Sequence, residues 1–166
     1  MNPRNKASQR YLIVPIGPSG SGKSTLFNTL QDKYPDLKSF SWDTLRHEWY
    51  DPKDYSRAWQ LASKDKTFYD KALNQFRQMV RNGDNIYVDN INISPKSRRQ
   101  FVEVAKSADY RTVAYVLEFD MDTLLERQRQ RADKFVPVDA VQRQAASVIR
   151  PISGEFDEVH NVNTAL

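Results

Sequence analysis

The sequence contains no cysteine and only two histidines, His47 and His160. These absences exclude a disulfide scaffold, a thiolate zinc site and a cysteine nucleophile, and they argue against a histidine-based metal centre. Long apolar runs are also missing, since the longest, around Tyr11–Ile16, is far too short to span a bilayer. The polar, basic N-terminal segment lacks the features of a secretory signal, so we expect a cytoplasmic protein with no membrane partner.

Charge of one sign is not in large excess either. The chain has 25 lysine and arginine residues against 21 aspartate and glutamate residues, which gives a formal net charge of +4. This excess permits a polyanionic partner without requiring one. Glycine and proline are sparse, at five and eight residues, and no repeat or linker interrupts the chain. The length predicts a single domain over residues 1–166, with residues 1–10 as a flexible tail.

Short apolar runs alternate with helical patterns along the chain. We expect strands over residues 11–16, 39–42, 86–89, 112–119 and 159–162. We expect helices over residues 23–33, 56–81, 95–107, 121–131 and 139–149. This alternation predicts an α/β fold in which helices cover both faces of a parallel sheet. Ligands of such sheets bind beyond the carboxyl ends of the strands.

A phosphate-binding motif lies between the first strand and the first helix. Residues 17–24, GPSGSGKS, fit G-x-x-x-x-G-K-[ST], where glycine allows a tight turn and backbone N–H groups surround an anion at a helix N-terminus. We expect Lys23 to reach the β- and γ-phosphates of ATP and the Ser24 hydroxyl to bind Mg²⁺. The residues expected to bind the nucleotide here are Gly17, Ser19, Gly20, Ser21, Gly22, Lys23, Ser24 and Thr25.

The motif in this context predicts a P-loop NTPase-type fold of three layers, with a helical lid over about residues 127–150. Kinases, GTPases and motor ATPases share this loop. The chain lacks the N-K-x-D motif that reads guanine, and a motor ATPase needs a larger core and more partner-sensing elements than this chain holds. A small ATP-dependent kinase is therefore the favoured class.

Candidate residues for the acceptor follow the second expected strand. The spacing of Asp43 and Arg46, D-x-x-R, places both side chains on one face of a helical turn. Asp43 is the candidate general base for an acceptor hydroxyl, and Arg46 is the candidate for a bidentate grip on an acceptor phosphate. The alternative is an N-cap aspartate beside a surface arginine.

Two further sets of polar residues complete the predicted site. Asp89 ends the third expected strand, where an acidic residue orients Mg²⁺ or its bound water, and Asn90 follows it; the alternative is an Asx turn that caps the next helix. Arg127 and Arg131 lie one helical turn apart and are expected to close over the triphosphate. The alternative for this pair is a solvated arginine-rich helix.

Taken in order, GPSGSGKST, DTLR, VDNIN and RQRQR followed by VP resemble the 5′-hydroxyl polynucleotide kinases over roughly Tyr11 to Val162. The resemblance, closest to the phage-type enzymes, implies an ATP- and Mg²⁺-dependent kinase that acts on 5′-OH ends of DNA or RNA. It implies that Lys23, Asp43 and Arg131 are catalytic and that Arg46 contacts the phosphate next to the reacting hydroxyl. It also implies that Val136 and Pro137 pack against an acceptor nucleobase.

The sequence departs from this family in two places. First, Ile91 stands where relatives have threonine in D-x-T-N. Second, the chain has no D-x-D-x-[TV] phosphatase motif, so we expect a kinase without phosphatase activity. A kinase for another hydroxyl, on a nucleoside, a sugar or a hydroxymethylated base, is the main alternative. A non-catalytic nucleotide-dependent nucleic-acid-binding module is the other, although the presence of both Asp43 and Arg131 argues against it.

Aromatic and basic residues supply further hints of a nucleic-acid partner. The aromatic residues near Asp43 either stack on bases or fill the core, and they are Trp42, Trp49, Tyr50, Tyr55 and Trp59. The basic residues that would follow a nucleic-acid backbone are scattered along the chain, and they are Arg46, Lys53, Arg57, Arg98, Arg99, Arg143 and Arg150.

Overall fold

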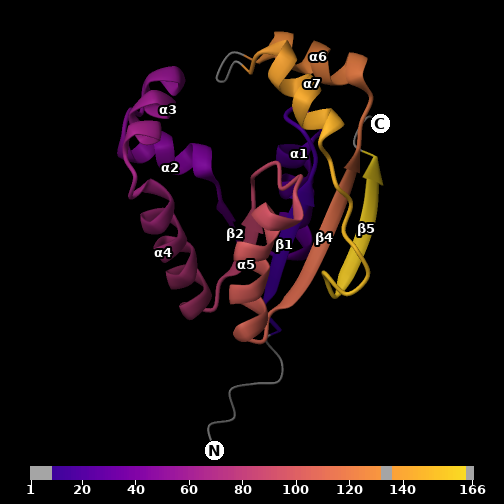
Figure 1. Cartoon of the computed structure of the whole chain (residues 1–166). Coiled ribbons are helices and arrows are strands. Elements are labelled where there is room, and N and C mark those ends of the chain that lie inside the picture. Colours follow the sequence, from indigo (N-terminus) through magenta and orange to yellow (C-terminus); the bar gives the residue numbers. More distant parts are fainter. Residues whose placement is uncertain (1–8, 132–135, 164–166) are drawn as a thin grey trace, which may run out of the picture.

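The computed structural model describes residues 9–131 and 136–163. Its strands are β1 (Tyr11–Ile16), β2 (Leu37–Phe40), β3 (Asn85–Val88), β4 (Arg111–Glu118) and β5 (Glu158–Asn163). Its helices are α1 (Lys23–Lys33), α2 (Trp42–Trp49), α3 (Tyr55–Lys64), α4 (Phe68–Arg81), α5 (Pro95–Ser107), α6 (Met121–Gln130) and α7 (Val138–Ala146). The strands form one sheet in the order β2-β3-β1-β4-β5, and every neighbouring pair is parallel (Figure 1).

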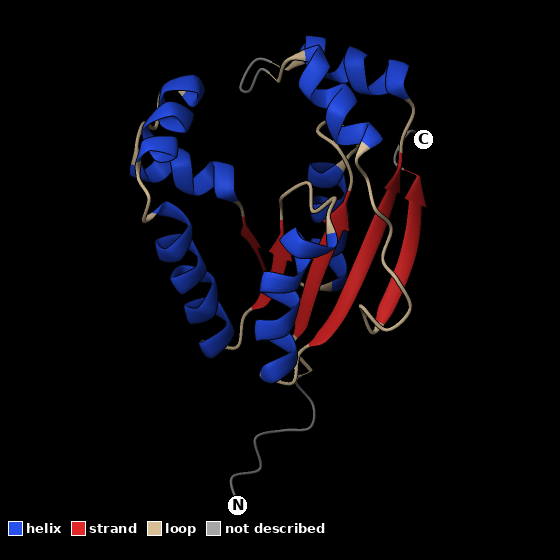
Figure 2. Ribbon diagram, in the orientation of Figure 1, coloured by secondary structure: helices blue, strands red, loops and turns tan. Residues whose placement is uncertain are grey.

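Helices cover both faces of the sheet, as the sequence predicts (Figure 2). Side chains alternate along β1, so that Leu12, Val14 and Ile16 point into one apolar cluster with α4 and α5. Ile13 points to the other face, where it packs with α1. Each cluster is the interface between the sheet and the helices on one of its faces. The fold is therefore a three-layer α/β fold of the P-loop type.

The predicted helix over residues 56–81 is wrong as a single element. The chain instead forms α3 and α4, with a turn at residues 65–67. The Asp65 carboxylate accepts hydrogen bonds from the backbone N–H and the hydroxyl of Thr67, at 2.9 and 2.6 Å. This local turn competes with helix continuation, and it lets α3 lie apart from α4 above the sheet (Figure 1).

The second strand begins earlier than predicted and ends at Phe40, so that Trp42 already belongs to α2. Ser41 caps this helix, because its side chain accepts a hydrogen bond from the Thr44 N–H at 3.3 Å. The short strand and its cap place the first turn of α2 directly beyond the carboxyl end of the sheet.

Helices α6 and α7 pack together above the same end of the sheet, and we call them the lid helices (Figure 1). Leu124, Val136 and Val141 form the small apolar core between them. Residues 1–8 of the predicted tail and residues 132–135 of the predicted lid region lie outside the described part of the chain. No helix in the described ranges is long and apolar enough to cross a membrane.

Arg98 is not available to a nucleic-acid backbone, contrary to one of the sequence hypotheses. Its side chain is fully buried and pairs with Glu155 at 3.0 Å. It also donates hydrogen bonds to the carbonyl oxygens of Asn92 and Ile149, both at 2.9 Å. The guanidinium therefore ties the segment before β5 to the loop after β3, which is a structural role.

Candidate active site

The phosphate-binding loop connects β1 to α1 at the carboxyl end of the sheet. Gly22 caps α1 with φ of 104°, a left-handed conformation that favours glycine. At Gly17 a Cβ would lie 2.5 Å from the Ser21 hydroxyl, so a side chain there would force the loop open. The Lys23 ammonium donates hydrogen bonds to the carbonyl oxygens of Gly17 and Pro18 at 3.2 and 2.9 Å. The loop is thus folded around its own lysine.

Both lid helices contact this loop. Arg127 of α6 donates a hydrogen bond to the Gly20 carbonyl at 2.7 Å. Gln144 of α7 accepts a hydrogen bond from the Ser19 N–H at 2.9 Å. The sequence analysis did not identify Gln144, because it lies far along the chain from the loop and belongs to no recognisable motif. Side chains from both lid helices therefore hold the loop in place.

Asp43 and Arg46 lie on one face of α2, as their spacing predicts. The Arg46 guanidinium pairs with the Asp43 carboxylate at 3.0 Å. It lies against the rings of Trp59 and Phe68, with its central carbon 5.0 and 5.2 Å from the ring centroids. It also donates a hydrogen bond to the Tyr69 hydroxyl at 3.2 Å. Arg46 is only 8% exposed, so the alternative of a surface arginine is wrong, and its guanidinium holds the Asp43 carboxylate.

Tyr55, the first residue of α3, lies beside Asp43. Burial, together with the neighbouring Asp43 carboxylate, raises the pKa of Tyr55 to about 12. The phenol is therefore neutral at ordinary pH and is able to donate a hydrogen bond to Asp43. The His47 ring stacks on Tyr55 at a centroid separation of 5.4 Å. α2 and α3 together build one wall of the site around the carboxylate.

Asp89 and Asn90 follow β3 and approach α2. The Asp89 N–H donates to the Phe40 carbonyl at 2.7 Å, and the Asn90 side-chain oxygen accepts from the Trp42 N–H at 3.0 Å. These bonds join the ends of β2 and β3 and fix where α2 begins. Sequence reasoning placed Asn90 at the site, and the structure adds this contact with the α2 N-terminus.

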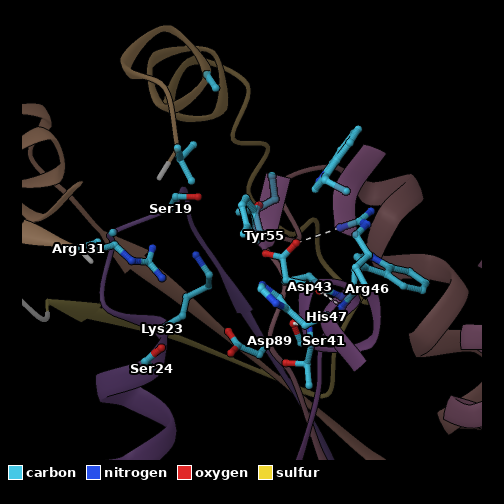
Figure 3. A pocket seen from close by; sticks show the side chains of 18 of the residues that line it. Ser19, Lys23, Ser24, Ser41, Asp43, Arg46, His47, Tyr55, Asp89 and Arg131 are labelled. Atoms are coloured by element: carbon cyan, nitrogen blue, oxygen red, sulfur yellow. Dashed lines mark hydrogen bonds and ion pairs between the residues drawn. The ribbon is translucent and has the colours of Figure 1, made fainter. Parts of the chain in front are cut away.

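One cavity of about 1320 Å³ joins these parts. Its lining includes every predicted site residue except Gly17 and Ser21, which lie inside the phosphate-binding loop. Figure 3 shows Lys23 and Arg131 on one side of the space, with Asp43 and Tyr55 on the other. The cavity therefore brings a phosphate-binding loop and a carboxylate to opposite sides of one volume.

The donor set at the cavity floor suits Mg²⁺. The Ser24 hydroxyl and the Asp89 carboxylate line the same volume and are oxygen ligands of the kind that Mg²⁺ prefers. Within the described ranges, no group of three or more histidine, aspartate or glutamate residues gathers into a metal site. In kinase sites Mg²⁺ is typically held by one or two protein ligands together with water and substrate phosphates, and Ser24 and Asp89 would supply such ligands.

Val136 and Pro137, the predicted nucleobase contacts, differ in exposure. Val136 is 8% exposed and packs with Leu124 in the core of the lid helices. Pro137 is exposed, and both residues border the cavity. Most of the Val136 side chain therefore serves lid packing, and Pro137 offers the larger free surface.

The five aromatic residues near Asp43 differ in their contacts, and Trp42 borders both the core and the cavity. Trp42 and Tyr50 pack against the main core, and Trp49 packs edge-on against Phe68 at 5.8 Å. Tyr55 and Trp59 border the cavity together with Trp42. Sequence reasoning did not anticipate the contact of Trp59 with Arg46, because these residues belong to different helices.

The fold and this cavity together define a P-loop kinase domain. A family model described as AAA domain matches residues 12–151, and the chain belongs to that family. The resemblance to polynucleotide kinases drawn from the motifs is confirmed by the comparisons with individual proteins.

One such relative is a protein of Autographa californica nuclear polyhedrosis virus whose name describes it as a bifunctional polynucleotide kinase/RNA ligase. It is 26% identical over 136 residues, and the match covers 77% of this chain and 19% of that protein. The chain therefore spans about a fifth of the length of this relative.

Solved structures share the fold at lower identity. A chain in the Pnkp1/Rnl/Hen1 RNA repair complex has a TM-score of 0.65 at 18% identity, over 89% of this chain and 46% of that one. A gluconokinase from Sinorhizobium meliloti 1021 has a TM-score of 0.62 at 18% identity, over 95% of this chain and 86% of that one. The fold is therefore common to proteins named for different acceptors.

Proposed function

We propose that this chain is an ATP-dependent polynucleotide 5′-hydroxyl kinase, without phosphatase activity, that acts on DNA or RNA ends. One observation carries the proposal: the phosphate-binding loop and the Asp43 carboxylate line the same cavity. A donor triphosphate on the loop and an acceptor hydroxyl at the carboxylate would meet in that space. The order of motifs along the chain, which resembles that of the polynucleotide kinases, supports a nucleic-acid acceptor.

On the donor side, the backbone N–H groups of Gly20 and of residues 22–25 bind the phosphates, and Lys23 neutralises their charge. Arg127 of α6 and Arg131, the residue that follows α6, reach the cavity and stabilise charge on the transferring phosphoryl group. Ser24 and Asp89 hold Mg²⁺, which supplies charge neutralisation at the phosphates when it is bound. Catalysis is therefore mainly a matter of positioning and electrostatics.

On the acceptor side, Asp43 accepts the proton of the 5′-hydroxyl. The hydroxyl oxygen forms a bond to the γ-phosphorus while the bond from that phosphorus to the ADP oxygen breaks. The products are a 5′-phosphorylated end and ADP, and the proton remains on Asp43 until it passes to water. Arg46 holds the carboxylate in the orientation that this transfer needs, and its remaining N–H groups serve the adjacent acceptor phosphate. Asn90 and Pro137 border the same acceptor volume.

The names of two similar proteins support this assignment. The viral relative is named for polynucleotide kinase and RNA ligase activities, and one structural neighbour belongs to an RNA repair complex. Because this chain spans a small part of the viral relative, the assignment concerns phosphoryl transfer alone.

A kinase for a small hydroxyl compound is the second candidate. The fold of this chain is shared with a gluconokinase, a protein named for a small hydroxyl acceptor. In that case the donor wall of the cavity would serve the same purpose, and the acceptor wall would bind a sugar or related compound.

The test is an acceptor panel with γ-labelled ATP and Mg²⁺. The acceptors are 5′-OH DNA, 5′-OH RNA, base-hydroxymethylated DNA, 3′-phosphorylated and free nucleosides, and gluconate. We expect label to appear at the 5′-OH end of an oligonucleotide. Label on a small molecule, with none on oligonucleotides, would replace this proposal with the second candidate, and nucleotide binding without any phosphorylated product would support a non-catalytic module.

A further inference from the structure

We propose that Trp59 is the surface on which the acceptor's terminal base stacks, so that the site selects a nucleic-acid end over a small hydroxyl compound. This inference rests on the proposed kinase function and names the part of the acceptor that the site recognises. The observations that carry it are the exposure of the indole, its place in the cavity wall and the way in which it is held.

Trp59 presents a large aromatic surface to the cavity. Its side chain is 47% exposed, and it lines the volume that also contains Asp43 and Lys23. Arg46 lies against one face of the ring, with its guanidinium carbon 5.0 Å from the centroid. The exposed surface therefore belongs to the opposite face and the edges of the indole. A flat apolar surface of this kind suits a nucleobase, because every base has a π-face that stacks on an aromatic ring.

The position of this surface is fixed relative to the general base. Arg46 is buried between Trp59 and Phe68, and the same guanidinium pairs with Asp43 at 3.0 Å. One side chain therefore holds both the carboxylate and the aromatic ring. A base that stacks on Trp59 would present its own sugar hydroxyl to the neighbouring carboxylate. Such pre-positioning is the kind of effect through which binding away from the reacting atoms accelerates transfer.

Other exposed aromatic side chains near the site do not share this arrangement. Trp49 is 39% exposed and Tyr69 is 53% exposed, yet neither lines the cavity. Three further rings line the cavity: Trp42 packs against the main core, and Tyr55 and His47 stack on each other. A sugar ring also stacks on an indole through its C–H groups, so the preference for a base rests on the wider, flat π-face that a base offers to the ring.

The experiment compares two substitutions of Trp59 on two acceptors. Trp59→Ala removes the ring, Trp59→Phe keeps a smaller one, and Trp49→Ala is the matched control for loss of an exposed indole outside the cavity. The acceptors are a 5′-OH oligonucleotide and the same oligonucleotide with an abasic 5′-terminal nucleotide. KM and kcat are measured for each acceptor, and KM for ATP is measured with each variant.

We expect Trp59→Ala to raise the oligonucleotide KM about tenfold, the effect of losing one stacked base, with KM for ATP unchanged. Trp59→Phe should retain most of the affinity, and Trp49→Ala should leave KM at the wild-type value. The abasic 5′ end should raise the acceptor KM of the wild-type enzyme by a similar factor. In Trp59→Ala, the abasic end should raise this KM only slightly further. This coupling distinguishes stacking from general damage to the wall, which would lower kcat on both acceptors.

The inference is overturned if the wild-type enzyme phosphorylates the abasic end as well as the normal end. It is also overturned if Trp59→Ala has the same KM as Trp49→Ala, or if its defect is equal on the two acceptors. All three results leave the polynucleotide kinase assignment in place. A wild-type enzyme that labels gluconate or a nucleoside and no oligonucleotide overturns the proposed function itself, so the two failures are distinguishable.

Discussion

The two walls of the cavity are built in different ways. The donor wall is made largely of one continuous loop, residues 17–25, most of whose residues, Lys23 among them, line the cavity, and the lid helices add contacts to it. The acceptor wall is made of side chains from α2 and α3, and Arg46 connects them to each other and to Tyr69 of α4 behind the wall. Recognition of phosphate is therefore local in the sequence, whereas recognition of the acceptor depends on contacts between separate helices.

The largest expected effect is on the donor wall. Lys23→Ala removes the charge that neutralises the donor phosphates, and we expect phosphoryl transfer to fall by about 10³-fold or more, with loss of ATP affinity. Isothermal titration with ATP and transfer of γ-label measure the two effects. Lys33→Ala, an exposed lysine at the other end of α1, is the control and should behave like wild type. Normal ATP binding by Lys23→Ala would remove Lys23 from the donor site.

The second prediction distinguishes the function of the acceptor wall from that of the donor wall. Asp43→Asn keeps an oxygen for Arg46 but cannot accept a proton, so we expect kcat to fall by about 10² to 10⁴-fold while ATP affinity is unchanged. The exposed Asp70→Asn, on α4, is the control. Steady-state kinetics and ATP titration provide the measurement. Full turnover in Asp43→Asn would mean that the carboxylate is not the general base.

A smaller effect tests the lid contact with the donor loop. Gln144→Glu places a carboxylate beside the Ser19 N–H, where it repels the phosphates of the donor. We expect KM for ATP to rise about tenfold, which corresponds to roughly 1.4 kcal/mol, while KM for the acceptor stays constant. Gln142→Glu, an exposed residue of the same helix, makes the same charge change away from the loop. Equal KM values for ATP in the two variants would contradict the contact between Gln144 and the donor loop.

The smallest expected effect is a pH dependence of the free energy of unfolding, to which Tyr55 in the acceptor wall contributes. Because burial and the nearby Asp43 raise the pKa of Tyr55 from 10.0 to about 12, the folded protein binds the phenolic proton more tightly than the unfolded chain does. The resulting stability is fully present below pH 10 and is lost as the pH rises through 12. Urea unfolding between pH 8 and 12 should show this loss.

Tyr55→Phe should show a shallower decrease, although other tyrosines with a raised pKa contribute to the loss in both proteins, namely Tyr50, Tyr87, Tyr110 and Tyr115. Identical slopes for wild type and Tyr55→Phe would show that Tyr55 contributes nothing to the alkaline transition.

The sequence predicted the donor wall better than the acceptor wall. β1 and α1 have the predicted bounds, and the loop between them has the predicted contents, because the motif, the strand and the helix are adjacent in the chain. The break between α3 and α4 was missed, although the polar residues 63–67 interrupt the apolar spacing between Ala62 and Phe68 and contain the Asp65 turn. That missed break separates Trp59 on α3 from Phe68 on α4, the two rings that enclose Arg46.

The order of residues 17–25 was enough to specify a phosphate-binding loop and its place at the end of a strand, because its properties come from short-range backbone geometry. The roles of Arg46, Trp59 and Gln144 came from packing. Each contacts residues of another helix or loop, and the energy of such contacts depends on which surfaces the folded chain brings together. The pattern of residues along the sequence does not show which surfaces come together in the folded protein.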